Sequence, residues 1–97
     1  MPDWNFAQQD PAEQLCSIQY FSMKKKHASG KGEVEIVITL REYVNPPDPA
    51  MKFLAQADKE VNQGGTAYKP VGWGPTLLRA LSECMNMIRR FPYEGPV

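Results

Sequence analysis

The sequence predicts a small α+β domain in which two amphipathic helices pack on one face of a two- to three-stranded antiparallel sheet. Three observations support this fold class. One segment alternates like a half-buried strand, two segments carry apolar residues at helical spacing, and 97 residues suffice for one core. A sheet with one face in water must cover its other face, and helices provide that cover. We expect one domain at 14–92, an N-terminal arm at 1–13 and a C-terminal tail at 93–97.

Two strands are predicted in the first half of the chain. Residues 33–44 carry an apolar side chain at every second position, which indicates one buried face and one mostly polar face. Residues 14–26 form the other strand, and we assign its core face to Cys16, Ile18 and Tyr20. Residues 66–73 are a candidate third strand, which Pro70 confines to a sheet edge.

Two amphipathic helices are predicted after these strands. The first, at 49–62, has Asp48 as a suitable N-cap and Pro49 at its first position. The second, at 75–91, ends before Pro92. The apolar stripes comprise Ala50, Met51, Leu54, Ala57 and Val61 in the first helix, and Leu77, Leu78, Leu81, Cys84, Met85 and Ile88 in the second.

The charge balance and the cysteine count argue against several classes of protein. Lys+Arg number 11 and Asp+Glu number 11, so a general polyanion binder is disfavoured. Two cysteines are too few for a disulfide-stabilised scaffold, and we expect free thiols in a cytoplasmic protein. The chain has no apolar run of membrane-spanning length and no spacing of His, Cys, Asp and Glu typical of metal sites. We therefore expect no membrane partner, no metal and no cofactor.

Candidate catalytic groups are few, and we predict that the protein is not an enzyme. His27 is the only histidine and lies in a predicted turn beside lysines, a position typical of an exposed side chain. Cys16 and Cys84 fall on predicted core faces, where a thiol behaves as a small hydrophobe. A third hypothesis is a thiol enzyme or small-molecule binder that uses one of these cysteines or a pocket between the sheet and the helices.

Four apolar side chains are left on the sheet face opposite the predicted core: Phe21, Met23, Val37 and Tyr43. Small monomers rarely leave such a patch bare, so either the arm, through Trp4 and Phe6, or a second chain should cover it. Zero net charge keeps the repulsion between copies weak. The leading prediction is a non-enzymatic protein-interaction domain that forms a homodimer, or binds another protein, through these six residues.

Four lysines cluster around the predicted turn: Lys24, Lys25, Lys26 and Lys31. In the second hypothesis they neutralise phosphates of a nucleic acid, while Phe21 and Tyr43 stack on bases. In the opposing interpretation they form a solvated hairpin tip and discourage edge-to-edge pairing. Glu33 and Glu35 follow the lysines directly and dilute the positive charge, which favours the interpretation as a solvated hairpin tip.

Overall fold

The computed structural model describes residues 3–96, and within them the chain is mostly β-structure. Its elements follow the order η1 (Asp3–Ala7), β1 (Cys16–Lys26), β2 (Glu33–Tyr43), η2 (Pro49–Met51), β3 (Phe53–Ala57), β4 (Val61–Gln63), β5 (Thr66–Tyr68), β6 (Val71–Gly74) and α1 (Leu77–Arg90), where η marks a 3-10 helix. Antiparallel pairing builds a four-stranded sheet in the order β1-β2-β3-β6, and β4 and β5 form a separate hairpin.

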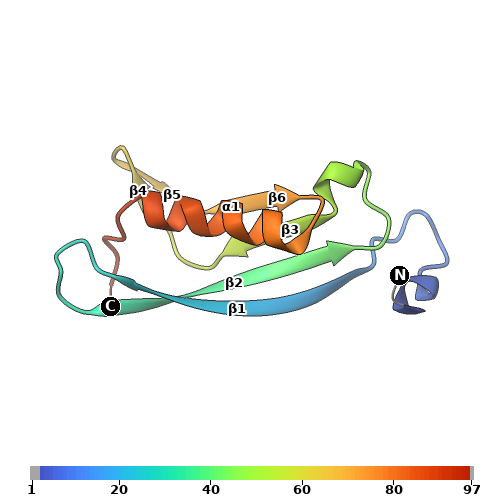
Figure 1. The fold of residues 1–97 in the computed structure, drawn as a ribbon, viewed down its shortest axis with the longest axis horizontal. Helices are drawn as coiled ribbons and strands as arrows, with labels where there is room; N and C mark the ends of the chain where they lie inside the picture. The colour runs from blue at the N-terminus through green and yellow to red at the C-terminus, as the bar shows by residue number, and fades with distance from the viewer. Residues whose placement is uncertain (1–2, 97) are drawn as a thin grey trace.

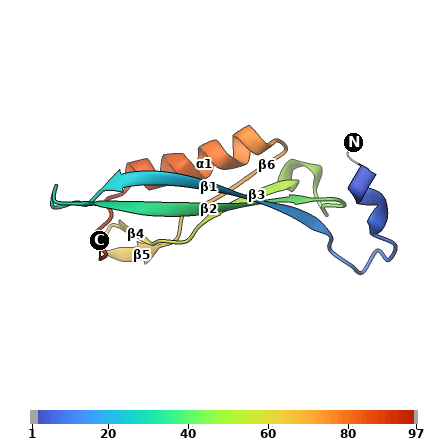
Figure 2. The same cartoon turned by 90° about the horizontal axis from the view of Figure 1, so that it is seen from below.

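The molecule is elongated, with principal extents of 50 × 21 × 21 Å. The long β1–β2 hairpin runs along this axis, and α1 lies over β3 and β6 on one face of the sheet (Figures 1 and 2). We call this the inner face and the opposite one the outer face. The N-terminal arm lies beyond one end of the hairpin, and the turn at 27–32 lies at the other end (Figure 1).

The predicted fold class is wrong, because the described residues contain one α-helix and six strands in two sheets. Residues 49–62, predicted as a helix, form η2, β3 and the start of β4. The Asp48 carboxylate does cap, accepting the Ala50 N–H at 2.9 Å, but only a single 3-10 turn follows. In β3 the side chains are buried on both faces, with Ala55 on the inner face and Leu54 on the outer face. Apolar residues on both faces of a strand produce the spacing that resembled a helical stripe.

The strand at 14–26 is confirmed as β1, but the core face assigned to it is wrong. In the register, Phe21 lies opposite Ile38 and Met23 lies opposite Ile36, so both point to the inner face. The residues assigned to the core lie on the outer face, where the Tyr20 side chain is 67% exposed. The strand at 33–44 is confirmed as β2, with all four of its predicted core residues buried: Val34, Ile36, Ile38 and Leu40.

The predicted helix at 75–91 is confirmed as α1, which buries Ala80, Cys84 and Ile88 against the sheet. Thr76 is the N-cap of this helix, and its hydroxyl accepts the Arg79 N–H at 3.2 Å. The candidate strand at 66–73 divides into β5 and β6, with Pro70 between them.

The last described residues pack on the domain. Tyr93 is only 3% exposed and joins the core cluster. The Tyr93 carbonyl accepts the Ala28 N–H at 2.9 Å, and the Pro92 carbonyl accepts the Asn62 N–H at 2.9 Å. The segment after α1 therefore connects the β1–β2 turn to the β4–β5 hairpin.

Candidate functional site: the open edge of the sheet

Within residues 3–96, one long side of β1 pairs with no other strand, and we call it the open edge. The Val44 N–H donates to the Leu15 carbonyl at 3.1 Å, and the His27 N–H donates to the Gly32 carbonyl at 3.0 Å. Hydrogen-bonded pairs alternate along an antiparallel ladder, so the odd-numbered residues of β1 bond to β2. The even-numbered residues, among them Tyr20, direct their backbone N–H and C=O groups away from β2, toward the open edge.

The first eight residues of β1 lack the features that usually protect an edge strand. From Cys16 to Met23 the strand has no proline and no charged residue. It is also apolar on both faces, with Ile18 and Tyr20 exposed on the outer face and Phe21 half-buried on the inner face. The other edge strand, β6, has four residues and packs closely against α1.

The structure divides the six residues of the predicted interface among three places. Phe21 and Met23 lie on the inner face, while Val37 and Tyr43 lie on the outer face. Trp4 and Phe6 belong to η1 at the end of the molecule, where Phe6 is 78% exposed. The structure thus does not gather all six on one face, and their role as an interface stays a prediction.

Sequence reasoning assigned Ile18 and Tyr20 to the core, whereas both are exposed on the outer face, where Trp73 is exposed as well. The available signal was that apolar residues occur at both even and odd positions of 16–23, so that one face had to keep apolar side chains beyond those needed for the core.

An apolar pocket of about 200 Å³ lies at the arm end of the outer face. The Tyr43 and Trp73 rings form part of its wall, with centroids 6.5 Å apart and planes inclined by 20°. Gln14, Pro47 and Met51 complete the lining. None of these five residues carries a charge, so the pocket has no charged group with which to select a ligand.

The lysines predicted to contact nucleic acid do not share one face of the sheet, and two of them lie opposite glutamates. Lys24 lies opposite Glu35 and Lys26 lies opposite Glu33, while Lys25 points to the inner face opposite Val34. The fourth, Lys31, lies in the turn.

The aromatic residues chosen to stack on bases are also separated from these lysines. Phe21 lies on the inner face, and Tyr43 is eight residues along β2 from Glu35, a distance of about 27 Å at 3.4 Å per residue. Nucleic-acid binding therefore stays a prediction that this geometry supports weakly.

The two thiols and the histidine lie apart from one another, each in contact with other residues of the domain. Cys84 is fully buried, its Sγ donates to the Pro70 carbonyl at 3.5 Å, and burial raises the pKa of this thiol to about 11. It is therefore a thiol rather than a thiolate at neutral pH. Cys16 is half-buried beside the Arg41 guanidinium. The His27 Nδ1 accepts the Ser29 N–H at 3.0 Å, and the ring edge contacts Tyr93.

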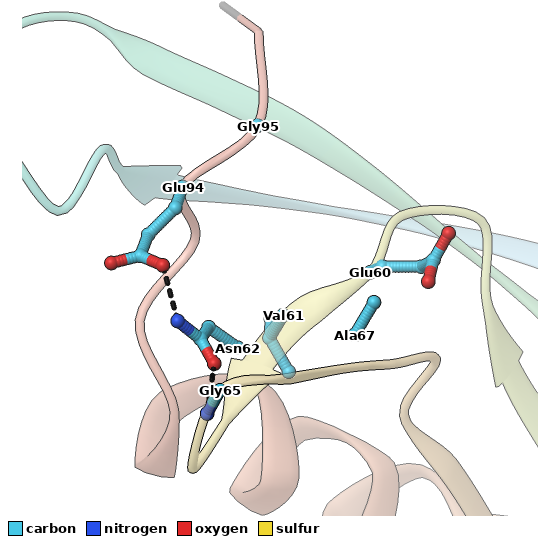
Figure 3. A pocket seen from close by; sticks show the side chains of 7 residues that line it. All are labelled: Glu60, Val61, Asn62, Gly65, Ala67, Glu94 and Gly95. Carbon is cyan, nitrogen blue, oxygen red and sulfur yellow. Dashed lines mark hydrogen bonds between the residues drawn. The ribbon is translucent and has the colours of Figure 1, made fainter.

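A cleft of about 320 Å³ lies where the C-terminal segment passes the β4–β5 hairpin. Figure 3 shows the Asn62 amide at its centre, donating to the Glu94 carboxylate and accepting the Gly65 N–H at 2.7 Å. The Glu60 carboxylate points away from this pair (Figure 3). Because the central polar groups bond to one another, they connect the C-terminal segment to the hairpin.

The described residues contain no group of three or more His, Cys, Asp or Glu side chains that could hold a metal ion. Between residues 3 and 96, the only α-helix falls short of the length and apolar character needed to cross a membrane.

We found no protein-family model that matches the chain, and no curated protein or solved structure that matches it significantly.

Proposed function

We propose that this chain is a non-enzymatic protein-interaction domain that self-associates through the open edge of β1. Two copies pair their β1 strands antiparallel and form one continuous sheet with both α1 helices on the same face. One observation carries the proposal: β1 is a long edge strand that has no charged residue or proline from Cys16 to Met23 and exposes Ile18 and Tyr20, so its edge lacks the usual protection against strand pairing.

Pairing of the two edges would satisfy the backbone and the side chains together. The outward N–H and C=O groups of the even-numbered residues would bond to the same groups of the second copy. On the outer face, Ile18 and Tyr20 would pack against the second copy's residues, and on the inner face Phe21 and Met23 would do so. Each of these side chains would lose exposure that it has in the single chain.

Sedimentation velocity of the chain between about 1 and 300 µM tests this proposal, since small protein interfaces often dissociate in the micromolar range. We expect the mass to rise from 11.0 kDa toward twice that value with concentration. Tyr20→Pro should stay monomeric, because proline removes an outward N–H and its ring obstructs the approaching strand. A single chain tolerates proline at an edge position whose N–H faces solvent.

Tyr20→Ala is the matched control, because it removes the same ring but keeps the backbone N–H. It should still dimerise, with a lower affinity than the parent chain. Circular dichroism melting of both variants checks that the single chain remains folded. A parent chain that sediments as a monomer up to 300 µM contradicts the proposal, and so does a folded Tyr20→Pro variant that dimerises as well as Tyr20→Ala.

A further inference from the structure

The two ends of β1 differ in local charge, although Glu33 and Glu35 lie opposite Lys26 and Lys24 and offset part of the positive charge there. The N-terminal arm contributes the carboxylates of Asp10 and Glu13, while the other end of β1 carries Lys24, Lys25 and Lys26, which we call the basic end. Figure 1 places the arm and the hairpin turn at opposite ends of the long axis. These charges cannot meet within one chain in this arrangement, but they would meet between two chains paired antiparallel.

We propose that the acidic arm of each copy docks against the basic end of the other copy, an inference that rests on the proposed β1 pairing. Even-numbered residues must face even-numbered residues across the new ladder. Pairing centred at Ile18 places Lys26 opposite residue 10 of the second copy. Centring at residue 19 or 20 places it opposite residue 12 or 14. Each of these registers brings the basic end to the arm.

Neither group of charges is neutralised by a close ion pair in the single chain. Within residues 3–96 the ion pairs are Lys52–Glu42 and Lys59–Asp58. The Asp10 Oδ1 accepts the Ala12 N–H at 2.9 Å, and the Glu13 Oε1 accepts the Asp10 N–H at 3.1 Å. These bonds hold the local turn, and both residues remain exposed.

Part of the arm is exposed and can contact a second copy. One side-chain hydrogen bond joins the arm to the residue before β1, where the Gln8 Oε1 accepts the Leu15 N–H at 3.0 Å. The exposed aromatic ring of Phe6 shows that η1 does not dock this side chain on its own domain.

Charge would also select the register of the pair. A parallel β1 pair, or an antiparallel pair centred near Lys25, sets lysines against lysines, and like charges directly opposite one another are destabilising. An antiparallel pair centred between Ile18 and Tyr20 replaces that repulsion with attraction to the arm. The acidic arm would therefore give the self-association its direction and its register.

Zero-length carbodiimide cross-linking tests the contact directly, because the reagent joins a carboxylate to an amine only when they touch. In an equal mixture of ¹⁴N- and ¹⁵N-labelled protein, the reagent should join a peptide from the arm to a peptide from the basic end. Some of these cross-linked pairs should contain one ¹⁴N peptide and one ¹⁵N peptide, which shows that they come from two copies. The Tyr20→Pro variant should lose these peptides. Mixed-isotope cross-links that omit the arm, or arm cross-links found only within one isotope, overturn the proposal.

Two charge reversals provide a second readout. Glu13→Lys should weaken dimerisation about 3- to 30-fold in 50 mM NaCl, since each dimer would contain two arm contacts and exposed ion pairs are individually weak. Glu83→Lys makes the same change of charge on the exposed side of α1 and should leave the affinity within about twofold. In 500 mM NaCl the gap between the two variants should shrink because salt screens exposed charges.

These measurements separate the two proposals. If Glu13→Lys and Glu83→Lys dimerise equally while Tyr20→Pro is monomeric, the arm contact is refuted and the β1 pairing stands. If the parent chain does not dimerise, both proposals fail.

Discussion

Replacing Gly72 by alanine is expected to force α1 away from the sheet. A Cβ at this position would lie 2.2 Å from the Ala80 carbonyl oxygen and 2.6 Å from the Cys84 nitrogen, both of them helix backbone atoms. Ordinary contact begins at 3.4 Å, so the Ala80 oxygen would have to retreat by about 1.2 Å, the difference between 3.4 and 2.2 Å. Because this atom belongs to a helix that buries Ile88 farther along, the movement would disturb the core rather than one side chain.

We expect Gly72→Ala to lower the free energy of unfolding by about 2 to 4 kcal/mol, at or above the upper end of ordinary overpacking. A domain of this size has about 5 to 15 kcal/mol in total, so the variant should still fold. Gly30→Ala is the comparison: its φ of 78° disfavours alanine, but nothing lies within 4 Å of the new Cβ. It should cost about 1 to 2 kcal/mol. Urea unfolding, measured below the concentration at which the chain associates, gives both values. A loss below 1 kcal/mol for Gly72→Ala would refute the close approach of β6 and α1.

Three further predictions concern the core and the faces of the sheet. Burial raises the Cys84 pKa above its ordinary 9.0 to about 11, so stability should be complete below pH 9 and fall by about 2 to 3 kcal/mol as the pH rises to 11. In urea unfolding across that pH range, a Cys84→Ala variant should lack this part of the slope. Tyr93→Ala should lower stability by about 3 kcal/mol in thermal or urea unfolding, because its ring is buried in the core. Phe21→Ala should cost about 1 to 2 kcal/mol and Tyr20→Ala less than 1 in dilute samples, and the reverse order would contradict the register of β1.

The sequence was most informative where an element has one buried face. In β2 the strict alternation from Val34 to Leu40 predicted both the strand and its core side, since β2 has one face under α1 and one open face. In α1 the stripe at helical spacing predicted the helix and its buried side for the same reason. Periodicity identifies such elements because burial changes along them with the period of the backbone.

The same reasoning failed where both faces of a strand are apolar. In β3, Leu54 and Ala55 are both buried, so the alternation disappears and the helix-favouring residues of 49–62 determined the prediction. In β1, apolar residues occur at both even and odd positions, so the pattern gave no basis for choosing a core face. The choice of Ile18 and Tyr20 was wrong. The register follows from pairing with β2, a long-range relationship that a single sequence does not display.

Of the candidate site, the sequence indicated spare apolar side chains on the strand at 14–26, and a second copy or another protein as the partner stays a prediction. It did not predict that β1 is an edge strand, because the neighbours of a strand depend on the order β1-β2-β3-β6. That order also separates Phe21 from Tyr43, which pattern analysis had placed together.

Amide hydrogen exchange of β1 tests the proposed edge pairing most directly. In the single chain, the outward N–H groups of Ile18, Tyr20 and Ser22 have no partner on the ladder, whereas those of Gln19 and Phe21 bond to β2. If β1 pairs with β1, raising the protein concentration through the association range should slow exchange at the three outward positions to the rate of their neighbours. Fast exchange at Ile18, Tyr20 and Ser22 at every concentration would contradict the account.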